Sequence, residues 1–211
     1  MLNKIDYTNL SPTVTRDTVK KMVGNCKKYG FRGICIPPTS LVHIGDSFTN
    51  TDFITSTVIG YPLGYNSTSS KIEDIYSISD FDVDEVDIVW NHGLFAEKKY
   101  LSLLKELSTI VDIATNRGLD TKIIVEEGFW NDNDLMLAES IVLDSGAAYI
   151  KTSSGYYAPA RLSTVKMWHR IKVKAAGGIR TAKDLRKFVE AGASVIGTSS
   201  GVAIAEELRN A

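Results

Sequence analysis

The chain has 211 residues, of which 44% are hydrophobic and 23% are charged, and its formal net charge is −1. This composition is ordinary for a globular enzyme, and the nearly balanced charge excludes an electrostatic attraction to nucleic acid or to an anionic membrane. Apolar runs stay well short of the ~20 residues of a membrane span, and the N-terminus lacks a signal-peptide core, so we expect a cytoplasmic protein.

Eight short apolar runs recur along the chain, and most segments between them have helical periodicity. Strands that alternate with helices in this number are typical of a closed parallel barrel. The sequence therefore predicts class α/β, with a single (β/α)8 TIM barrel as one domain over residues 1–211. The runs centre near Asp6, Ile34, Val58, Ile88, Ile124, Lys151, Lys174 and Gly197.

Local signals mark the helix ends in chain order. Thr15 is expected to cap the first helix and Gly30 to end it. The longest helix is expected from Phe95 to Asn116. Thr181 is a good N-cap for a helix over residues 182–191.

The sixth and seventh runs each carry a lysine, Lys151 and Lys174, which are 23 residues apart, about one strand and helix unit. A lysine within an apolar strand is costly unless something uses it. Reactive groups gather at the carboxyl ends of barrel strands, so we expect the two ammonium groups to lie close together. Their repulsion in a poorly solvated pocket favours a neutral amine on one of them, and such an amine can form a Schiff base with a carbonyl.

A lone carboxylate, Asp87, lies between Val86 and Ile88 in the fourth run. If it faces the barrel interior, it can pair with Lys174 and relay protons. The alternative is a buried ion pair that only fixes the barrel, although such pairs are poor stabilisers. The sequence leaves both interpretations open.

The last two predicted strands end in small, polar turns, Gly177-Gly178 and Ser199-Ser200-Gly201. Backbone N–H groups at a helix N-terminus bind anions readily, and glycine lets the backbone come close to a ligand. Loops after these strands often form a phosphate site in this fold. Either segment alone is explained by ordinary turn chemistry, but the two together predict a phosphorylated small molecule as substrate.

Other charged residues near strand ends are weaker candidates. Asp6 is expected either to face the barrel centre or to cap the turn that follows it. Glu126 and Glu127 are expected to be solvated acids at the barrel mouth. Lys122 and Lys172 lie nearer the strand starts and are expected to be snorkelling or surface lysines.

Cysteines and histidines indicate no metal site. Cys26 and Cys35 fall on a predicted helix and a predicted buried strand, and we expect reduced core thiols. No spacing resembles a zinc site. His43, His92 and His169 form no metal pair, and each is expected to be solvent-exposed.

Taken together, these segments resemble the deoxyribose-phosphate aldolases, and the similarity spans nearly the whole chain. Each segment is weak evidence alone, but their order and their barrel spacing make the match specific. The segments are Asp6-Tyr7-Thr8, Thr57-Val58-Ile59-Gly60-Tyr61-Pro62-Leu63-Gly64, Asp84-Glu85-Val86-Asp87, Lys122-Ile123-Ile124-Val125-Glu126, Lys151-Thr152-Ser153-Ser154-Gly155, Lys174-Ala175-Ala176-Gly177-Gly178-Ile179-Arg180 and Gly197-Thr198-Ser199-Ser200-Gly201.

The resemblance implies reversible cleavage of 2-deoxy-D-ribose 5-phosphate into D-glyceraldehyde 3-phosphate and acetaldehyde, without a metal or an organic cofactor. In this family pattern Lys151 matches the Schiff-base lysine, Lys174 the lysine that tunes it, and Asp87 the aspartate of the proton relay. The phosphate-binding positions match Gly177, Gly178, Ser199 and Ser200, and the pocket positions near the substrate hydroxyls match Asp6 and Thr8.

The sequence departs from the family pattern in three places. Tyr7 stands where many members carry histidine, and Trp90 and His92 stand where smaller or aliphatic residues are usual. The sequence ends at Arg209-Asn210-Ala211, without the tyrosine-terminated tail of some members. These departures leave the lysines and the aspartate in place, but leave rate and substrate tolerance open.

Two other functions stay open at this stage. One is another phosphosugar aldolase or a transaldolase-like enzyme, and the other is a barrel that binds phosphosugars without turnover. The expected partner is a small phosphorylated sugar, not nucleic acid or a membrane. Barrels of this size often form homo-oligomers, and the sequence does not decide whether this one does.

Overall fold

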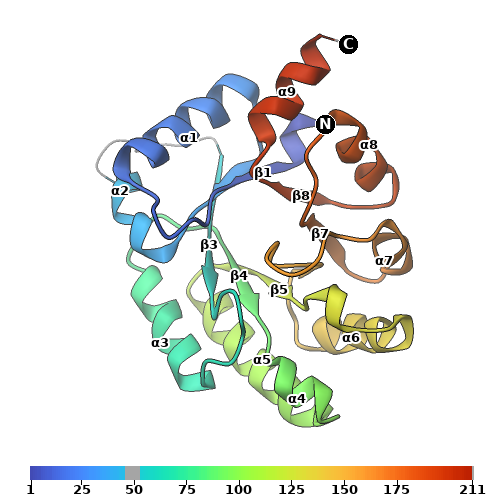
Figure 1. Cartoon of the computed structure of the whole chain (residues 1–211). Coiled ribbons are helices and arrows are strands. Elements are labelled where there is room, and N and C mark those ends of the chain that lie inside the picture. Colours follow the sequence, from blue (N-terminus) through green and yellow to red (C-terminus); the bar gives the residue numbers. More distant parts are fainter. Residues whose placement is uncertain (46–52, 211) are drawn as a thin grey trace.

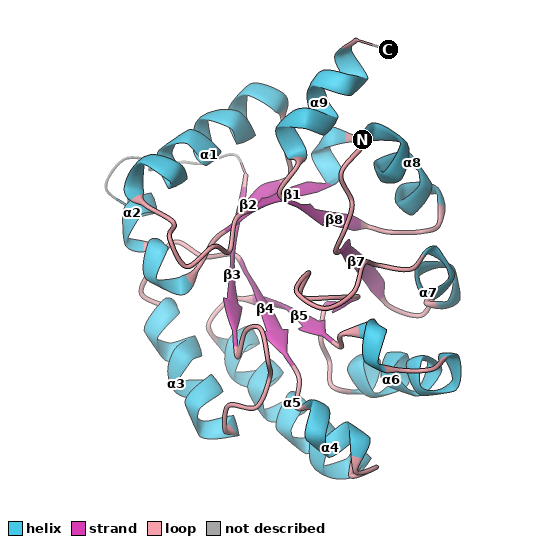
Figure 2. Cartoon of the chain, viewed as in Figure 1, coloured by secondary structure: helices cyan, strands magenta, loops and turns pink. Residues whose placement is uncertain are grey.

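The computed structural model describes residues 1–45 and 53–210, which form a closed barrel of eight parallel strands. The strands follow one another around the barrel in sequence order, and helices surround them as an outer layer (Figures 1 and 2). The predicted (β/α)8 TIM barrel is therefore confirmed. The strands are β1 (Ile5–Thr8), β2 (Gly33–Cys35), β3 (Ile54–Ile59), β4 (Glu85–Val89), β5 (Asp120–Ile124), β6 (Tyr149–Lys151), β7 (Lys172–Ala176) and β8 (Val195–Thr198).

Helices occupy the connections between the strands and follow the last one. None of those in the described part of the chain is both long enough and apolar enough to cross a membrane. The α-helices are α1 (Arg16–Tyr29), α2 (Val42–Gly45), α3 (Thr68–Ile78), α4 (His92–Ala96), α5 (Tyr100–Asn116), α6 (Asp132–Asp144), α7 (Leu162–Met167), α8 (Ala182–Glu190) and α9 (Gly201–Arg209). Short 3-10 helices are η1 (Leu2–Lys4), η2 (Pro38–Ser40) and η3 (Glu127–Phe129).

The apolar core lies between the strands and the helix layer, because neighbouring residues of a strand face opposite sides. Ile88 and Ile150 are fully buried in this core, while the adjacent Asp87 and Lys151 contact each other inside the barrel. The same alternation therefore places the apolar side chains outside the ring of strands and the charged side chains inside it.

The register of the strands sets which charged residues become neighbours. Asp87 of β4 is the Cα partner of Lys122 in β5, and Lys151 of β6 is the partner of Lys174 in β7. Parallel pairing thus places two lysines side by side, and an aspartate beside a third lysine.

Several predicted helix ends are confirmed. The Thr15 side chain accepts a hydrogen bond from the Thr18 amide, and Gly30 ends α1 in the left-handed conformation. Thr181 begins α8 in a capping box with Asp184. These contacts satisfy backbone groups that a helix end leaves without intrahelical partners.

The prediction of one long helix over residues 95–116 is wrong, because two helices share this segment. Asn91 caps α4 by accepting a hydrogen bond from the Leu94 amide, so the helical structure begins earlier than predicted. Lys98 then adopts a positive φ of 58°, which interrupts the helix before α5 starts at Tyr100. Apolar periodicity continues across this interruption and therefore hides it from a pattern-based prediction.

Candidate active site

Strands β4, β6 and β7 bring together Asp87, Lys151 and Lys174, as the sequence predicts. Lys151 Nζ lies 2.7 Å from Asp87 Oδ2, and Lys174 Nζ lies 2.8 Å from the same oxygen. Lys151 is 2% exposed and the other two residues are fully buried. One carboxylate oxygen thus accepts hydrogen bonds from both lysines, within the reach that proton transfer requires.

Asp6 faces the barrel centre, which settles the choice that the sequence left open. Its Oδ2 lies 2.7 Å from Lys174 Nζ, and its Oδ1 accepts a hydrogen bond of 2.8 Å from Arg32. The Lys174–Asp6 contact is short enough for an ion pair, but its angles fall outside hydrogen-bond geometry. Lys174 is therefore held between two carboxylates, those of Asp6 and Asp87.

These ion pairs determine the charge states of the buried groups. Burial acts to lower the pKa of Lys174, but Asp6 and Asp87 outweigh it and raise the pKa above its ordinary value. Burial acts to raise the pKa of Asp87, but Lys122, Lys151 and Lys174 outweigh it and hold the pKa well below its ordinary value. The expected repulsion between lysines therefore does not neutralise Lys174, because carboxylates lie between the cations.

The prediction that Lys122 is a snorkelling or surface lysine is wrong, whereas Lys172 is exposed as predicted. Lys122 is fully buried, with Nζ 2.6 Å from Glu85 Oε2 and 3.0 Å from Asp87 Oδ1. Arg32 contacts Glu85 in turn. The signal that could have found Lys122 is its strand register with Asp87, which composition and spacing do not show.

The expectation of solvated acids at the barrel mouth is also wrong, since Glu126 and Glu127 are both fully buried. Glu126 accepts hydrogen bonds from the Ser153 hydroxyl at 2.8 Å and from the Ser154 amide at 2.9 Å. Glu127 accepts one from the Arg161 amide at 2.8 Å. The two acids thus hold the loop that follows Lys151.

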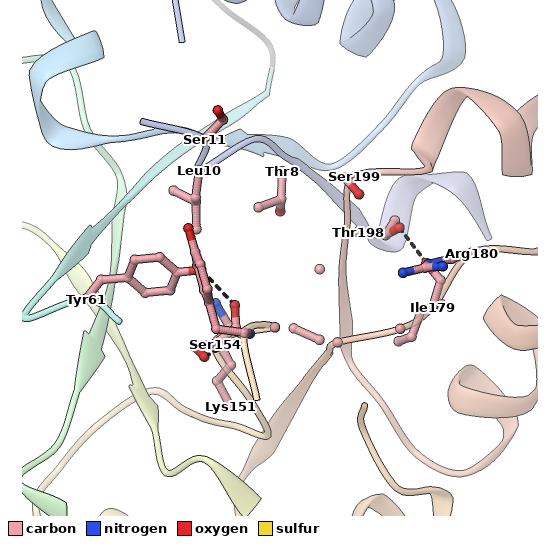
Figure 3. A pocket seen from close by; sticks show the side chains of 16 residues that line it. Thr8, Leu10, Ser11, Tyr61, Lys151, Ser154, Ile179, Arg180, Thr198 and Ser199 are labelled. Carbon is pink, nitrogen blue, oxygen red and sulfur yellow. Dashed lines mark hydrogen bonds between the residues drawn. The ribbon is translucent and has the colours of Figure 1, made fainter. Parts of the chain in front are cut away.

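A cavity of about 280 Å³ opens at the carboxyl ends of the strands, with Lys151 in its lining. Figure 3 shows Tyr61 on one side of this cavity and Ser199 and Arg180 on the other. Tyr61 and Arg180 also line it. Both lie in segments that carry the family resemblance, but the sequence analysis gave neither a role in the site. The predicted site residues that line it are Thr8, Lys151, Gly177, Gly178 and Ser199.

The turns after β7 and β8 form the side of the cavity that suits an anion. Gly177 and Gly178 have positive φ values of 110° and 74°, which side chains rarely adopt. Ser199 lines the cavity, whereas Ser200 is not among its lining residues. Ser200 is the N-cap of α9 and makes no side-chain capping hydrogen bond, so it leaves the first amides of that helix uncapped.

The expectation that each histidine is solvent-exposed is wrong for His43 and His92, which are partly buried, and correct for His169. His92 is partly buried beside Trp90, whose indole N–H donates a hydrogen bond of 2.7 Å to His92 Nδ1. Burial, with a smaller contribution from Lys71, lowers the pKa of His92 to about 4. His43 is half-buried.

Both cysteines are free and buried, as predicted. Burial raises the pKa of the Cys35 thiol to about 11 and that of Cys26 to about 12. Both thiols are therefore neutral at physiological pH and are poor nucleophiles.

A closed (β/α)8 barrel with a buried lysine and aspartate cluster beneath a polar cavity defines the class of barrel aldolases. Comparison with known proteins names the family. The deoxyribose-phosphate aldolase of Metamycoplasma arthritidis is 35% identical over 210 residues, which cover 97% of this chain and 96% of the relative. That of Caldicellulosiruptor saccharolyticus is 36% identical, with 96% of both chains covered. This chain therefore belongs to the deoxyribose-phosphate aldolase family.

Solved structures agree with this assignment. The structure described as a tetrameric deoxyribose phosphate aldolase from Aeropyrum pernix superimposes with a TM-score of 0.90 at 32% identity, covering 99% of this chain and 90% of the other. No protein-family model matches the chain. The resemblance inferred from the sequence segments is confirmed.

Proposed function

We propose that this chain reversibly cleaves 2-deoxy-D-ribose 5-phosphate into D-glyceraldehyde 3-phosphate and acetaldehyde through a Schiff base on Lys151. The observation that carries the proposal is the placement of Lys151, which lines the cavity while its Nζ lies 2.7 Å from Asp87 Oδ2. A reactive amine needs both access to a carbonyl and a neighbouring group that accepts its protons.

Condensation is the first step. The neutral Lys151 amine attacks the substrate aldehyde carbon, and the resulting carbinolamine loses water to give an iminium. Asp87 is held as an anion and Lys174 as a cation, so the pair can take up and return the protons that this step moves. Lys151 Nζ and Lys174 Nζ both contact Asp87 Oδ2, so one carboxylate serves both lysines.

Carbon–carbon cleavage is the second step. The C3 hydroxyl of the iminium gives up its proton while the C2–C3 bond breaks, which releases D-glyceraldehyde 3-phosphate. The bonding electrons pass to the iminium nitrogen and leave an enamine on Lys151. Protonation of the enamine carbon and addition of water then release acetaldehyde and restore the amine. Asp87 and Lys174 move these protons through a water molecule.

Substrate orientation follows from the two sides of the cavity. The phosphate is placed at the turn of Gly177 and Gly178 and at the start of α9, near Ser199 and Ser200. Glycine there allows backbone N–H groups to approach an anion. Thr8 is placed near the substrate hydroxyls because it lines the same cavity, and Asp6 acts through Lys174.

Reductive trapping tests the proposal. Borohydride reduction in the presence of acetaldehyde is expected to leave an ethyl group on Lys151, located by peptide mass spectrometry. Lys172→Met, which removes an exposed lysine two residues before Lys174, is the matched control and is expected to retain trapping. An adduct at another residue, or none on the folded protein, contradicts the assignment.

A substrate panel separates cleavage of deoxyribose phosphate from related functions. Turnover with acetaldehyde as the donor aldehyde supports the proposal, whereas turnover only with a larger donor indicates a transaldolase-like enzyme. If no substrate reacts but deoxyribose phosphate raises the melting temperature, the barrel binds without turnover.

The proposal extends to the setting of the enzyme. We place it in the cytoplasm, in the breakdown of deoxyribose phosphate, and as a homo-oligomer. Exposed apolar side chains on the helix layer, such as Leu101 and Met136 at 83% and 50% exposure, support self-association. A monomer mass from light scattering contradicts the homo-oligomer. Cell fractionation tests the cytoplasmic location.

A further inference from the structure

Lys122 contacts the proposed machinery but has no task in the mechanism above. Its Nζ lies 3.0 Å from Asp87 Oδ1 and 2.6 Å from Glu85 Oε2, while Asp87 Oδ2 faces Lys151 and Lys174. Lys122 is fully buried and does not line the cavity. A buried ammonium that touches a reactive carboxylate but cannot reach the substrate acts through that carboxylate.

Lys122 belongs to a larger set of linked ionic side chains, here called the buried charge network. Arg32 and Glu85 extend the network toward the amino-terminal ends of the strands. Arg32 contacts Glu85 and also binds Asp6, each at 2.8 Å. Four cations therefore face three carboxylates, which leaves one positive charge in excess. The members are Asp6, Arg32, Glu85, Asp87, Lys122, Lys151 and Lys174.

Among the described residues, no other carboxylate makes an ion pair with the four cations. Asp84 acts electrostatically on Arg32 and Glu85 but accepts its hydrogen bond from the Thr55 amide. The Cys35 thiol of β2 is neutral, because burial raises its pKa to about 11. Tyr149 of β6 presents its ring, 5.8 Å from Lys122 Nζ. Glu126 lies outside the network and accepts hydrogen bonds from the loop after β6. Ser56 of β3 contacts Lys122 and Glu85 as a hydroxyl.

The contacts distinguish Lys151 from the other cations. Arg32 lies between Asp6 and Glu85, Lys122 between Glu85 and Asp87, and Lys174 between Asp6 and Asp87. Within the network, Lys151 contacts a single carboxylate, Asp87, and shares that oxygen with Lys174. An excess positive charge in a buried site is disfavoured. The cation that contacts the fewest carboxylates loses its proton most easily, and so removes this excess.

We propose that Lys122 is a positioning residue whose charge, acting through Oδ1 of Asp87, makes the Lys151 ammonium release its proton and become the reactive amine. The inference rests on the proposed function, because it takes Lys151 to be the nucleophile. With Lys122 in place, loss of one proton from Lys151 leaves three cations facing three carboxylates. Without Lys122 the network is already balanced, and Lys151 keeps its proton to higher pH.

The test measures the rate of acetaldehyde and borohydride trapping on Lys151 against pH, and takes the pH of half-maximal rate as the midpoint. Lys122→Met is expected to raise the midpoint by about one pH unit, the smaller end of the effect of a close charge. The double variant Lys122→Met/Glu85→Gln removes one charge of each sign and is expected to return the midpoint toward the wild-type value. A purely structural role predicts greater damage in the double variant and no return.

Two further variants keep the test decisive. Lys122→Arg preserves the charge and is expected to keep the wild-type midpoint. Glu85→Gln increases the positive excess and is expected to lower the midpoint, so it replaces Lys122→Met if that variant does not fold. An unshifted midpoint in folded Lys122→Met, or an unshifted or raised midpoint in Glu85→Gln, overturns the inference. Wild-type protein that is not trapped at Lys151 at any pH instead overturns the proposed function.

Discussion

At the scale of single residues, His92 shows how burial selects one charge state. It follows β4, the strand that carries Asp87, and its ring lies 5.3 Å from that of Phe129 and 6.3 Å from that of Trp130. Its Nδ1 accepts the indole hydrogen bond of Trp90. An imidazolium has no free lone pair to accept that bond, so the folded protein favours the neutral ring.

Protonation of His92 is therefore expected to destabilise the fold as the pH falls. The pKa of His92 is about 4 in the folded protein, against an ordinary value of 6.5. Between these values the unfolded chain binds more protons, so this contribution is fully present above pH 6.5 and is lost toward pH 4. We expect His92→Gln to abolish about 3 kcal/mol of pH-dependent loss in the free energy of unfolding.

Urea denaturation at neutral pH and near pH 4.5 measures this effect. The control is His169→Gln, because His169 is exposed, and it should keep the pH dependence of the wild type. Equal pH dependence in the wild type and in His92→Gln would show that His92 does not titrate between the folded and unfolded states.

At the scale of elements, the turn after β7 depends on two glycines for its shape. Gly178 has a φ of 74°, and a Cβ at this position would lie 2.9 Å from the Cβ of Pro159. A side chain at Gly178 would therefore have to shift either Pro159 or the turn itself. A shift of the turn displaces the proposed phosphate site, and the positive φ strains the backbone in either case.

We expect Gly178→Ala to raise KM for deoxyribose phosphate about tenfold, equivalent to about 1.4 kcal/mol of binding, and to leave acetaldehyde trapping on Lys151 intact. Gly118→Ala is the matched control, because Gly118 has a φ of 78° and open space around a Cβ. Both variants should lose about 1–2 kcal/mol of stability from backbone strain. An unchanged KM in Gly178→Ala would contradict the proposal that the phosphate binds at this turn.

The elements also show how far sequence reasoning reaches. Hydrophobic runs and their spacing predicted the barrel, because alternation along a strand is a local property. The sequence predicted that Lys151 and Lys174 lie close together because both lie near strand ends, and that an inward Asp87 can pair with Lys174. The structure shows that pair and adds the contact of Asp87 with Lys151. It missed Lys122 and Glu126, because their burial depends on strand register and on loop contacts with Ser153, which are relations between distant segments. It joined α4 to α5 because periodicity does not record a positive φ at Lys98.

At the scale of the whole molecule, the charged interior and the apolar core are separate regions. Apolar side chains fill the space between strands and helices, whereas the buried charge network fills part of the barrel itself. Buried ions with partners contribute little net stability, but a buried ion that loses its partner is strongly destabilising. Individual members of the network should therefore differ sharply in their effect on folding.

We expect Lys151→Met to leave the free energy of unfolding unchanged or higher, because Lys151 contacts one carboxylate, and Asp87 keeps Lys122 and Lys174 as partners. Lys174→Met should lower it by about 1–3 kcal/mol, because Asp6 Oδ2 loses its contact and Asp87 loses one of three lysines, while Arg32 still pairs with Asp6. Urea unfolding of the two variants makes the comparison, and both should be inactive. Equal losses of stability would contradict the idea that the number of carboxylates a lysine contacts decides its effect on folding.

The network also spans the length of the barrel, from Arg32 beside the start of β2 to Lys151 at the end of β6. The substrate cavity touches one end of it, and Arg32 is partly exposed at the other, with 17% of its side chain accessible. An engineer can therefore adjust the reactivity of the amine from the floor of the barrel and the choice of substrate from its rim. Amine reactivity and substrate choice thus depend on different residues, so a substitution that changes one can leave the other unchanged.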